Sequence, residues 1–360
     1  MTTRVVHVAS GREWRGGQRQ VWLLARELAR LDDVEQVVVT GRGSELAGRL
    51  LRTGVPVRSV RWDAGLDPRV LPGLFAELRA GPAVVHAHDA HALTLAGAAS
   101  RLAGLPLVVT RRVDFHLRRP GFWTRADRVI AISRAVAHVL VADGVRPDRV
   151  TIVHSGISLE ETRRAERLGI RARLVLGADA TVAVNVGALV PHKDHANLIR
   201  AAARLARAFP SLHWVIAGEG PARGALERLT GELGLADRVH LIGHIDEPAR
   251  LVADADLFVM SSREEGLGTS VLEAMALGIP VASTTAGGLP EMLKDGAGVL
   301  APPGDPDALA DAVVRLLSEP GLARAVTERA TVAVQQFTAA RMAEAVRTVY
   351  RSCAHFIDGS

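Results

Sequence analysis

The chain has 360 residues, of which 48% are hydrophobic and 23% are charged, with a formal net charge of +5. This balance excludes a disordered or low-complexity protein, and the length suits two domains of roughly 100 to 200 residues each. The single cysteine, Cys353, excludes an internal disulfide or a thiolate-rich metal site, and neither a signal peptide nor an apolar run of about 20 residues is apparent, so we expect a cytoplasmic protein.

Short runs rich in valine and isoleucine alternate with amphipathic segments along the chain. Several runs are apolar at consecutive positions, which is typical of strands buried on both faces of a parallel sheet. Helices are predicted at residues 21–31, 196–209, 222–233 and 308–317. The predicted strands are residues 5–9, 37–40, 57–60, 83–88, 107–110, 129–132 and 151–153, and then 182–186, 214–217, 239–242, 257–260, 280–282 and 298–300.

The repeated alternation of strand and helix predicts two doubly wound, Rossmann-like α/β domains. Residues 160–173 are charged and carry no strand pattern, so we place the boundary there. The predicted domains are residues 1–160 and 161–338, followed by an amphipathic helix at 339–360 that can pack back on the first domain. Ligands of such sheets bind beyond the carboxyl ends of the strands, which predicts a ligand in the cleft between the domains.

The segment after the predicted strand 257–260 is the richest in chemical groups. Its loop has Glu265 and then Gly266, Leu267, Gly268 and Thr269, whose backbone N–H groups precede a helix and suit an anionic or hydroxyl-rich ligand. Glu273 lies one turn into that helix, so both glutamates can reach one ligand. A capping box formed by residues 270–273, in which Glu273 only satisfies a backbone donor, is the alternative.

At this point the sequence resembles the retaining GT-B glycosyltransferases of family 4, whose signature of two glutamates eight positions apart is matched by Glu265 and Glu273. The other matching segments span nearly the whole chain: residues 186–194, 217–221, 243–245, 255–259, 287–291 and 298–303 in the second half, and 15–18, 86–89, 132–133 and 155–157 in the first.

The resemblance implies a GT-B fold and a reaction that needs no metal or other cofactor, with a nucleotide sugar as the co-substrate. Glu273 would bind the ribose hydroxyls, and Glu265 the donor sugar. Lys193 would meet the diphosphate, since negative charge develops there as the bond breaks. A solvated surface lysine is the alternative. Family members commonly have a second cation where this chain has Ala188, so we expect other groups, such as His192, to meet part of that charge.

Glycines at the predicted strand ends are further candidates for the donor site. Gly16 and Gly17 precede the first predicted helix and suit anion binding, although a simple turn explains them nearly as well. Gly187 and Gly218 follow two strands of the second domain. A similar arrangement recurs at Gly287 and Gly288, with Glu291, which can simply complement a helix dipole, as the least weighted candidate.

Histidines cluster after the predicted strand 83–88, where His86 and His88 share a face and His91 follows. A metal-dependent hydrolase that uses these three residues is the first alternative function. No second ligand group at a suitable spacing appears downstream, so histidines that line the cleft or pack in the core are favoured, with His88 as a catalytic candidate and no metal expected.

The strand 107–110 ends in Arg111 and Arg112 where related enzymes often have a histidine. We expect Arg111, with Glu265, Lys193 and His88, in the catalytic set, and either arginine could replace the missing phosphate-binding cation or hold a phosphorylated acceptor. Residues 111–128 contain six arginines and three aromatic residues, a composition that suits an acidic membrane surface. A solvated loop with ordinary aromatic anchors is equally compatible with it.

Residues 1–155 contain 23 arginines and 14 acidic residues, a net charge of +9, and the remainder carries −4. A cationic lobe attracts anionic partners. We therefore expect a glycan or glycolipid acceptor, such as a lipid-linked lipopolysaccharide or exopolysaccharide intermediate, and peripheral contact with the inner face of the membrane. A non-catalytic nucleic-acid-binding or scaffold protein is the second alternative, but the basic residues are dispersed and no nucleic-acid module is recognisable, so no nucleic-acid partner is expected.

Overall fold

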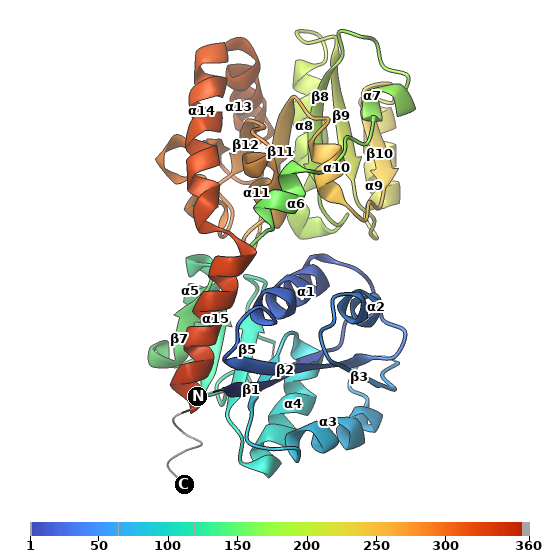
Figure 1. Cartoon of the computed structure of the whole chain (residues 1–360). Coiled ribbons are helices and arrows are strands. Elements are labelled where there is room, and N and C mark those ends of the chain that lie inside the picture. Colours follow the sequence, from blue (N-terminus) through green and yellow to red (C-terminus); the bar gives the residue numbers. More distant parts are fainter. Residues whose placement is uncertain (1, 64, 119, 355–360) are drawn as a thin grey trace. The chain divides into compact units, whose positions relative to one another are not determined.

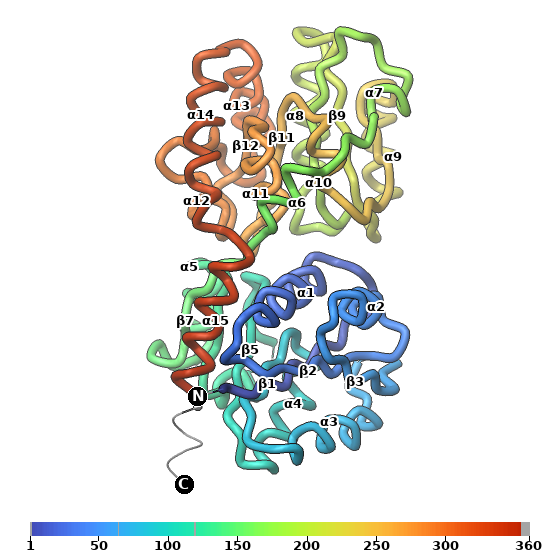
Figure 2. The backbone as a smooth tube through the Cα atoms, viewed as in Figure 1, coloured from blue at the N-terminus to red at the C-terminus, as the bar shows by residue number. Residues whose placement is uncertain are grey.

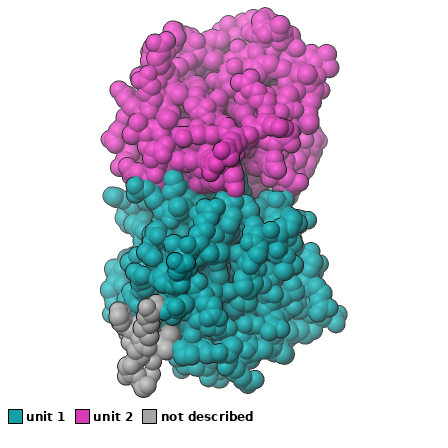
Figure 3. All heavy atoms as spheres, in the orientation of Figure 1, with its two compact units in different colours: residues 1–156, 338–360 teal, residues 157–337 magenta. Residues whose placement is uncertain are grey.

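The computed structural model describes residues 2–63, 65–118 and 120–354 (Figure 1). Arg119, within the arginine-rich stretch, and residues 355–360 of the predicted last helix lie outside the described residues. Contacts divide the chain into two compact units, coloured separately in Figure 3. The first unit is Met1–Gly156 with Thr338–Ser360, and the second unit is Ile157–Phe337.

The first unit contains a seven-stranded sheet in which every pair of neighbouring strands is parallel. The strand order is β3-β2-β1-β4-β5-β6-β7, so the direction of winding reverses between β1 and β4. The strands are β1 (Thr3–Ala9), β2 (Val34–Gly41), β3 (Val57–Val60), β4 (Val84–Ala87), β5 (Leu107–Arg111), β6 (Arg128–Ala131) and β7 (Val150–Ile152). The helices are α1 (Gly16–Leu28), α2 (Glu45–Arg52), α3 (Leu71–Leu78), α4 (Ala90–Ala103), α5 (Arg134–Ala142) and α15 (Ala339–Ala354).

The last helix, α15, belongs to the first unit and lies beside α1 (Figure 2). Its apolar side covers β1 and β4, and Tyr350 near its C-terminal end is fully buried. Arg347 and Arg351 form ion pairs with Asp33, just before β2. The apolar face of α15, rather than its helix propensity, therefore fixes its position on the sheet. No helix in the described part of the chain has both the length and the apolar character needed to cross a bilayer.

The second unit contains a six-stranded parallel sheet whose order is β10-β9-β8-β11-β12-β13, with the reversal between β8 and β11. Its core packs α8 and α13 against one face. The strands are β8 (Thr181–Val186), β9 (Leu212–Ala217), β10 (Val239–Gly243), β11 (Leu257–Met260), β12 (Val281–Thr284) and β13 (Val299–Ala301). The helices are α6 (Leu159–Arg163), α7 (Ile170–Arg173), α8 (His195–Leu205), α9 (Arg223–Glu232), α10 (Pro248–Val252), α11 (Thr269–Ala276), α12 (Leu289–Met292), α13 (Pro306–Ser318) and α14 (Pro320–Ala333).

The predicted start of the first helix at residue 21 is wrong, because α1 begins at Gly16 and includes Gly17. Glycine has a low helix propensity, so no local pattern indicates that the helix extends through this pair. A tertiary contact offsets that cost. The amide of Gln20 donates to the carbonyl of Gly156 (2.9 Å) and accepts from its N–H (3.2 Å), which holds the first turn in place.

Val175 is a strained position in the second unit, with a φ of 53° and 90% of its side chain exposed. It follows α7 at a helix end where glycine is usual. We expect Val175→Gly to raise the free energy of unfolding by about 1 kcal/mol, because glycine removes the steric cost of a positive φ and no packing is lost. Urea unfolding would measure this.

The matched control for that prediction is Val332→Gly, which makes the same substitution inside α14 at a position that is 72% exposed. We expect it to lower the free energy of unfolding by about 0.5 kcal/mol, because glycine is the poorer helix former. The proposed strain at Val175 is excluded if both variants are destabilised alike.

Candidate functional site

The loops that follow β8 and β11 meet at the point where the second sheet reverses its winding. The carbonyl of His192 accepts the N–H groups of Arg263 (2.8 Å) and Glu264 (3.3 Å), and the hydroxyl of Ser261 donates to the carbonyl of Lys193 (3.0 Å). Parallel sheets bind ligands at this kind of reversal, beyond the carboxyl ends of the strands. These hydrogen bonds to backbone carbonyls therefore hold the two predicted donor-binding loops together in the described structure.

Lys193 and Glu265, predicted from separate motifs 72 positions apart, form a direct ion pair. The side chain of Lys193 is 19% exposed and that of Glu265 is 9% exposed. Ser262 donates a further hydrogen bond to the Glu265 carboxylate (3.2 Å), and the N–H of Gly288 donates to the Glu265 carbonyl (2.9 Å). The alternative in which Lys193 is a solvated surface lysine is thus wrong, because its ammonium is paired in a largely buried position.

Asp194, which follows Lys193, was missed by the sequence analysis. It has a φ of 45°, a conformation that few residues other than glycine adopt without strain. Its carboxylate accepts the N–H of Asn197 at the start of α8 (3.3 Å) and the Nε of Arg263 (2.5 Å). These bonds hold the turn that carries Lys193. The one signal in the sequence was an aspartate just before a predicted helix, a residue type that is typical of an N-cap.

The alternative in which Glu273 closes a capping box is also wrong. Helix α11 begins at Thr269 with Gly268, at a φ of 90°, as its N-cap, so Ser270 is not the N-cap residue that the box requires. Ser270 instead donates to the carbonyl of Val186 (3.2 Å). Glu273 lies within α11 and is 1% exposed. The first turn has no acidic residue, so its N–H groups keep their affinity for an anion.

One of the predicted glycines, Gly218, has a clear steric role. A Cβ at Gly218 would lie 1.9 Å from the carbonyl oxygen of Gly187, because the loops after β8 and β9 run against each other. At Gly187 a Cβ would make ordinary contacts with Lys193 and His195. Gly218 is therefore needed for the backbone approach, and its role in binding a donor stays a prediction.

The other predicted glycines differ in their surroundings. Gly16 and Gly17 have open space where a Cβ would stand, at the uncapped start of α1. Gly287 has a φ of 49°, and Gly288 precedes α12, which has Glu291 in its first turn. Gly266 and Leu267 are buried, whereas Thr269 is half-buried.

A chain of buried polar groups runs through the first sheet. His7 of β1 lies opposite His86 of β4 in the register. His7 Nδ1 and His88 Nε2 are 2.9 Å apart, and His86 bonds Tyr350 (2.6 Å) and Thr110 (2.7 Å) through its two nitrogens. Sequence reasoning missed His7, which only the pairing of β1 with β4 brings to His86.

The proton positions in this chain follow from Arg112. A guanidinium only donates, so Nδ1 of His88, 3.3 Å from Arg112 Nη2, accepts, and the His88 proton lies on Nε2. His88 then donates to His7 Nδ1. Burial lowers the pKa of His7 to about 4 and holds the pKa values of His86 and His88 well below 6.5. All three imidazoles are therefore neutral at pH 7.

The metal set of the hydrolase alternative, His86, His88 and His91, does not assemble. His91 is exposed in the first turn of α4. A different trio, His7, His86 and His88, has ligand atoms within 4.8 Å of one another. The hydrogen bonds above engage both nitrogens of His86 and of His88, so they account for this cluster.

Arg111 contacts its own loop in the described structure. Its guanidinium donates to the carbonyls of Val113 (3.1 Å) and Phe115 (2.7 Å), and lies 5.2 Å from the ring centre of Trp123. These bonds leave its predicted catalytic role as a prediction.

Two aromatic side chains of the arginine-rich stretch pack inward. Trp123 is 6% exposed. Phe122 packs closely on Gly97 of α4, where an added Cβ would lie only 2.5 Å from the Cγ of the Phe122 ring. These positions fit ordinary aromatic anchors better than an exposed membrane surface.

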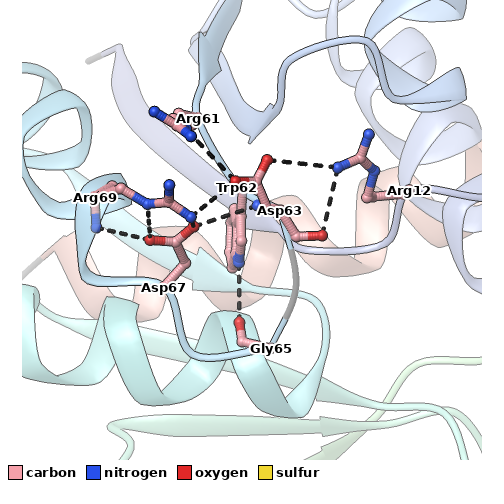
Figure 4. Close-up of polar contacts among 7 residues, drawn as sticks. All are labelled: Arg12, Arg61, Trp62, Asp63, Gly65, Asp67 and Arg69. Carbon is pink, nitrogen blue, oxygen red and sulfur yellow. Dashed lines mark hydrogen bonds and ion pairs between the residues drawn. The ribbon is translucent and has the colours of Figure 1, made fainter.

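Several arginines of the first unit are paired with acids in the loop after β3 (Figure 4). Asp67 accepts Nε (2.8 Å) and Nη2 (2.7 Å) of Arg69, which holds the pKa of Asp67 well below its usual range. Asp63 faces Arg69 (2.8 Å), Arg61 (3.4 Å) and Arg12 (3.8 Å). Part of the positive charge of this unit is therefore compensated locally.

Two family models match most of the chain. Residues 14–161 match the model described as Glycosyltransferase Family 4, and residues 167–332 match Glycosyl transferases group 1. The chain belongs to the family 4 glycosyltransferases. The resemblance found in the sequence is thus confirmed, as are the GT-B fold class and its two Rossmann-like domains.

The relatives found by sequence similarity match this chain over only part of their own length. A D-inositol 3-phosphate glycosyltransferase of Mycolicibacterium paratuberculosis is 36% identical over 58% of this chain and 48% of its own. A lipopolysaccharide core biosynthesis glycosyltransferase of Rhizobium meliloti is 36% identical over 44% of this chain and 46% of its own. The match thus spans about half the length of these curated relatives. The Anabaena protein HepE, solved with UDP, has the same fold, with a TM-score of 0.83 and 21% identity over 97% of this chain and 100% of HepE.

Proposed function

We propose that this chain binds a nucleotide sugar at the carboxyl edge of the second sheet and transfers the sugar, with retention of configuration, to an acceptor on the first unit. The observation that carries the proposal is the pairing of Lys193 with Glu265 at the sheet reversal, beside the start of α11, whose N-cap is a glycine. A cation and the N–H groups of a helix N-terminus suit a diphosphate, and a carboxylate suits sugar hydroxyls.

In this mechanism Lys193 and the N-terminus of α11 stabilise the negative charge of the departing diphosphate. Glu265 binds the donor sugar and Glu273 the ribose hydroxyls. The acceptor attacks the face that the diphosphate leaves, and the diphosphate takes the acceptor proton, so no covalent enzyme intermediate forms. We propose that the reaction needs no metal, since these groups already supply positive charge, with His88 and Arg111 completing the catalytic set.

The proposed acceptor is a lipid-linked or surface-glycan intermediate at the inner face of the membrane. The net charge of +9 over residues 1–155 supports an anionic partner. The relative named for lipopolysaccharide core biosynthesis supports the same class of acceptor.

A thermal-shift screen against UDP, GDP, ADP and their sugars tests the proposal. UDP and UDP-glucose come first, because HepE was solved with both. A donor at 100 times its dissociation constant should stabilise the native state by about 2.7 kcal/mol. The protein is then incubated with the stabilising donor and a lipid-extract acceptor. Formation of a glycosylated product tests transfer, and its anomeric configuration, determined by NMR, tests retention. The proposal fails if none of these nucleotides binds.

A further inference from the structure

Arg112 lies at the carboxyl edge of the first sheet, directly after β5. The neighbouring strand β4 ends beside His88, and the next strand, β1, completes the reversal of winding. This reversal is where ligands of doubly wound sheets bind. The Lys193 and Glu265 loops belong to the second sheet.

The guanidinium of Arg112 is held in a fixed orientation by two bonds to one residue. Nη1 donates to the carbonyl of His88 (2.7 Å), and Nη2 donates to His88 Nδ1 (3.3 Å). Because His88 is itself bonded to His7, the position of the fork is set by the polar chain inside the sheet. These two bonds engage two of the five N–H donors of an arginine.

The remaining donors of Arg112 are not matched by an acid. Within the described residues, no carboxylate lies within ion-pair distance of its guanidinium, and its Nε is buried without a hydrogen-bond partner. Asp89 acts on it only through space, because that carboxylate binds Ser10 and caps α4. Arg69, by contrast, is satisfied by two carboxylates.

A buried cation without a counter-ion is costly, and the neutral histidines beside it do not reduce that cost. Burial lowers the pKa of Arg112 to about 10, which still leaves it charged at pH 7. A bound anion would supply both the missing charge and an acceptor for the free donors. Arg112 as a whole residue is half-buried, so it is not sealed in the core of the unit.

We infer that Arg112 is a substrate-specificity residue that binds an anionic group, a phosphate or a carboxylate, at the edge of the first sheet. The inference deepens the proposed function by naming the charge of the substrate. It rests on that function for the reaction in which the anion takes part, but the binding of an anion by Arg112 can be tested without it. The anion has two sources, an acceptor that carries a phosphate or acid group, or the nucleotide sugar itself.

The test compares Arg112→Gln with Arg118→Gln, which removes an exposed arginine from the same loop. The probes are glycerol 3-phosphate, glucuronate and UDP, titrated by calorimetry at constant ionic strength. Glycerol 3-phosphate and glucuronate are added to protein already saturated with UDP, so that the donor site is filled. We expect Arg112→Gln to weaken binding of one of these anions about tenfold or more, with Arg118→Gln unchanged.

The pattern of loss identifies the source of the anion. Loss of glycerol 3-phosphate or glucuronate with intact UDP binding assigns the anion to the acceptor, whereas loss of UDP binding assigns it to the donor. Arg112→Lys keeps the positive charge but loses the planar guanidinium. Its affinity for the anion should lie between those of the parent chain and Arg112→Gln. If the parent chain binds no UDP, the small anions are titrated alone, and their dependence on Arg112 stands even though the proposed donor fails.

A purely structural role for Arg112 predicts a different result. Arg112→Gln would then unfold at a lower temperature while its affinity for the anions stayed that of the parent chain. Equal affinity in the folded Arg112→Gln protein, or no binding of any of the three anions by the parent chain, overturns the inference.

Discussion

Lys193→Ala is expected to reduce kcat/KM for the nucleotide sugar by about 100- to 1000-fold, measured by initial rates with the donor found in the screen. The ammonium of Lys193 is proposed to face the diphosphate, whose negative charge is greatest in the transition state. In the free chain the same ammonium is paired with Glu265. Donor binding measured by calorimetry should weaken less, by about 10- to 100-fold, because the ground state has less charge at the leaving oxygen.

Lys294→Ala is the matched control, since Lys193 and Lys294 are the only lysines in the chain and Lys294 is exposed. It should leave both the rate and the binding unchanged. A thermal unfolding curve establishes that Lys193→Ala is folded, which matters because the substitution leaves the buried Glu265 without its cation. Parent-like rates in a folded Lys193→Ala protein would remove the lysine from the proposed mechanism.

Glu273→Gln is expected to weaken nucleotide binding about tenfold without unfolding the second unit. The side chain is buried within α11, so an amide of nearly the same volume tests the carboxylate charge. Calorimetry with the free base, the nucleoside and the nucleoside diphosphate separates the ribose from the other parts of the ligand. A loss that is also present for the free base would argue against ribose recognition by Glu273.

The second large effect is a loss of stability as the pH falls from 6.5 to about 4. The pKa of His7 is about 4 in the folded chain and 6.5 when it is unperturbed, so the unfolded chain takes up the proton first. The free energy of unfolding keeps the full contribution of the neutral histidine above pH 6.5. Below that pH it declines by about 1.4 kcal/mol per pH unit for each such histidine, until the folded chain also takes up the proton. Burial acts in the same direction on His86 and His88, and on His195 in the second unit.

Urea unfolding at a series of pH values measures this slope. His7→Asn keeps a hydrogen-bonding side chain. It should reduce the slope of the free energy of unfolding against pH by the amount that corresponds to about one proton taken up on unfolding, in the pH range 4 to 6.5. His91→Gln, at an exposed position in α4, is the control. Paired aspartates such as Asp67 lose their stabilising effect only at lower pH, since their pKa values are held below 3.8. A slope that does not change in His7→Asn would show that this histidine does not titrate on unfolding.

The sequence predicted the strands well because a buried parallel strand leaves a local signal, a run of consecutive apolar residues. It predicted the donor-site candidates Lys193 and Glu265 because each follows such a strand, and parallel strands bring their ends to one edge. Their direct ion pair was not predictable, since it depends on β8 and β11 being neighbours in the sheet although they are far apart in the chain.

Other features depended on contacts that no local pattern reports. The start of α1 at Gly16 depends on Gln20 bonding Gly156, which lies 136 positions away. The end of α15 contributes Tyr350 to His86 across 264 positions. Sequence reasoning identified His86 and His88, and only the disfavoured hydrolase alternative added His91, from proximity along the chain.

The amino-acid sequence by itself determined the family, the two parallel α/β domains and the residue types of the candidate donor site, because apolar runs and glycine-bearing motifs act over a few positions. Only the tertiary structure decided which side chains meet: His7 with His88, Arg263 with Asp194, and Arg112 with no acid at all among the described residues. The reason is that strand order and register, which set these pairs, arise from packing between segments distant in the chain, and packing is not encoded in any one of them.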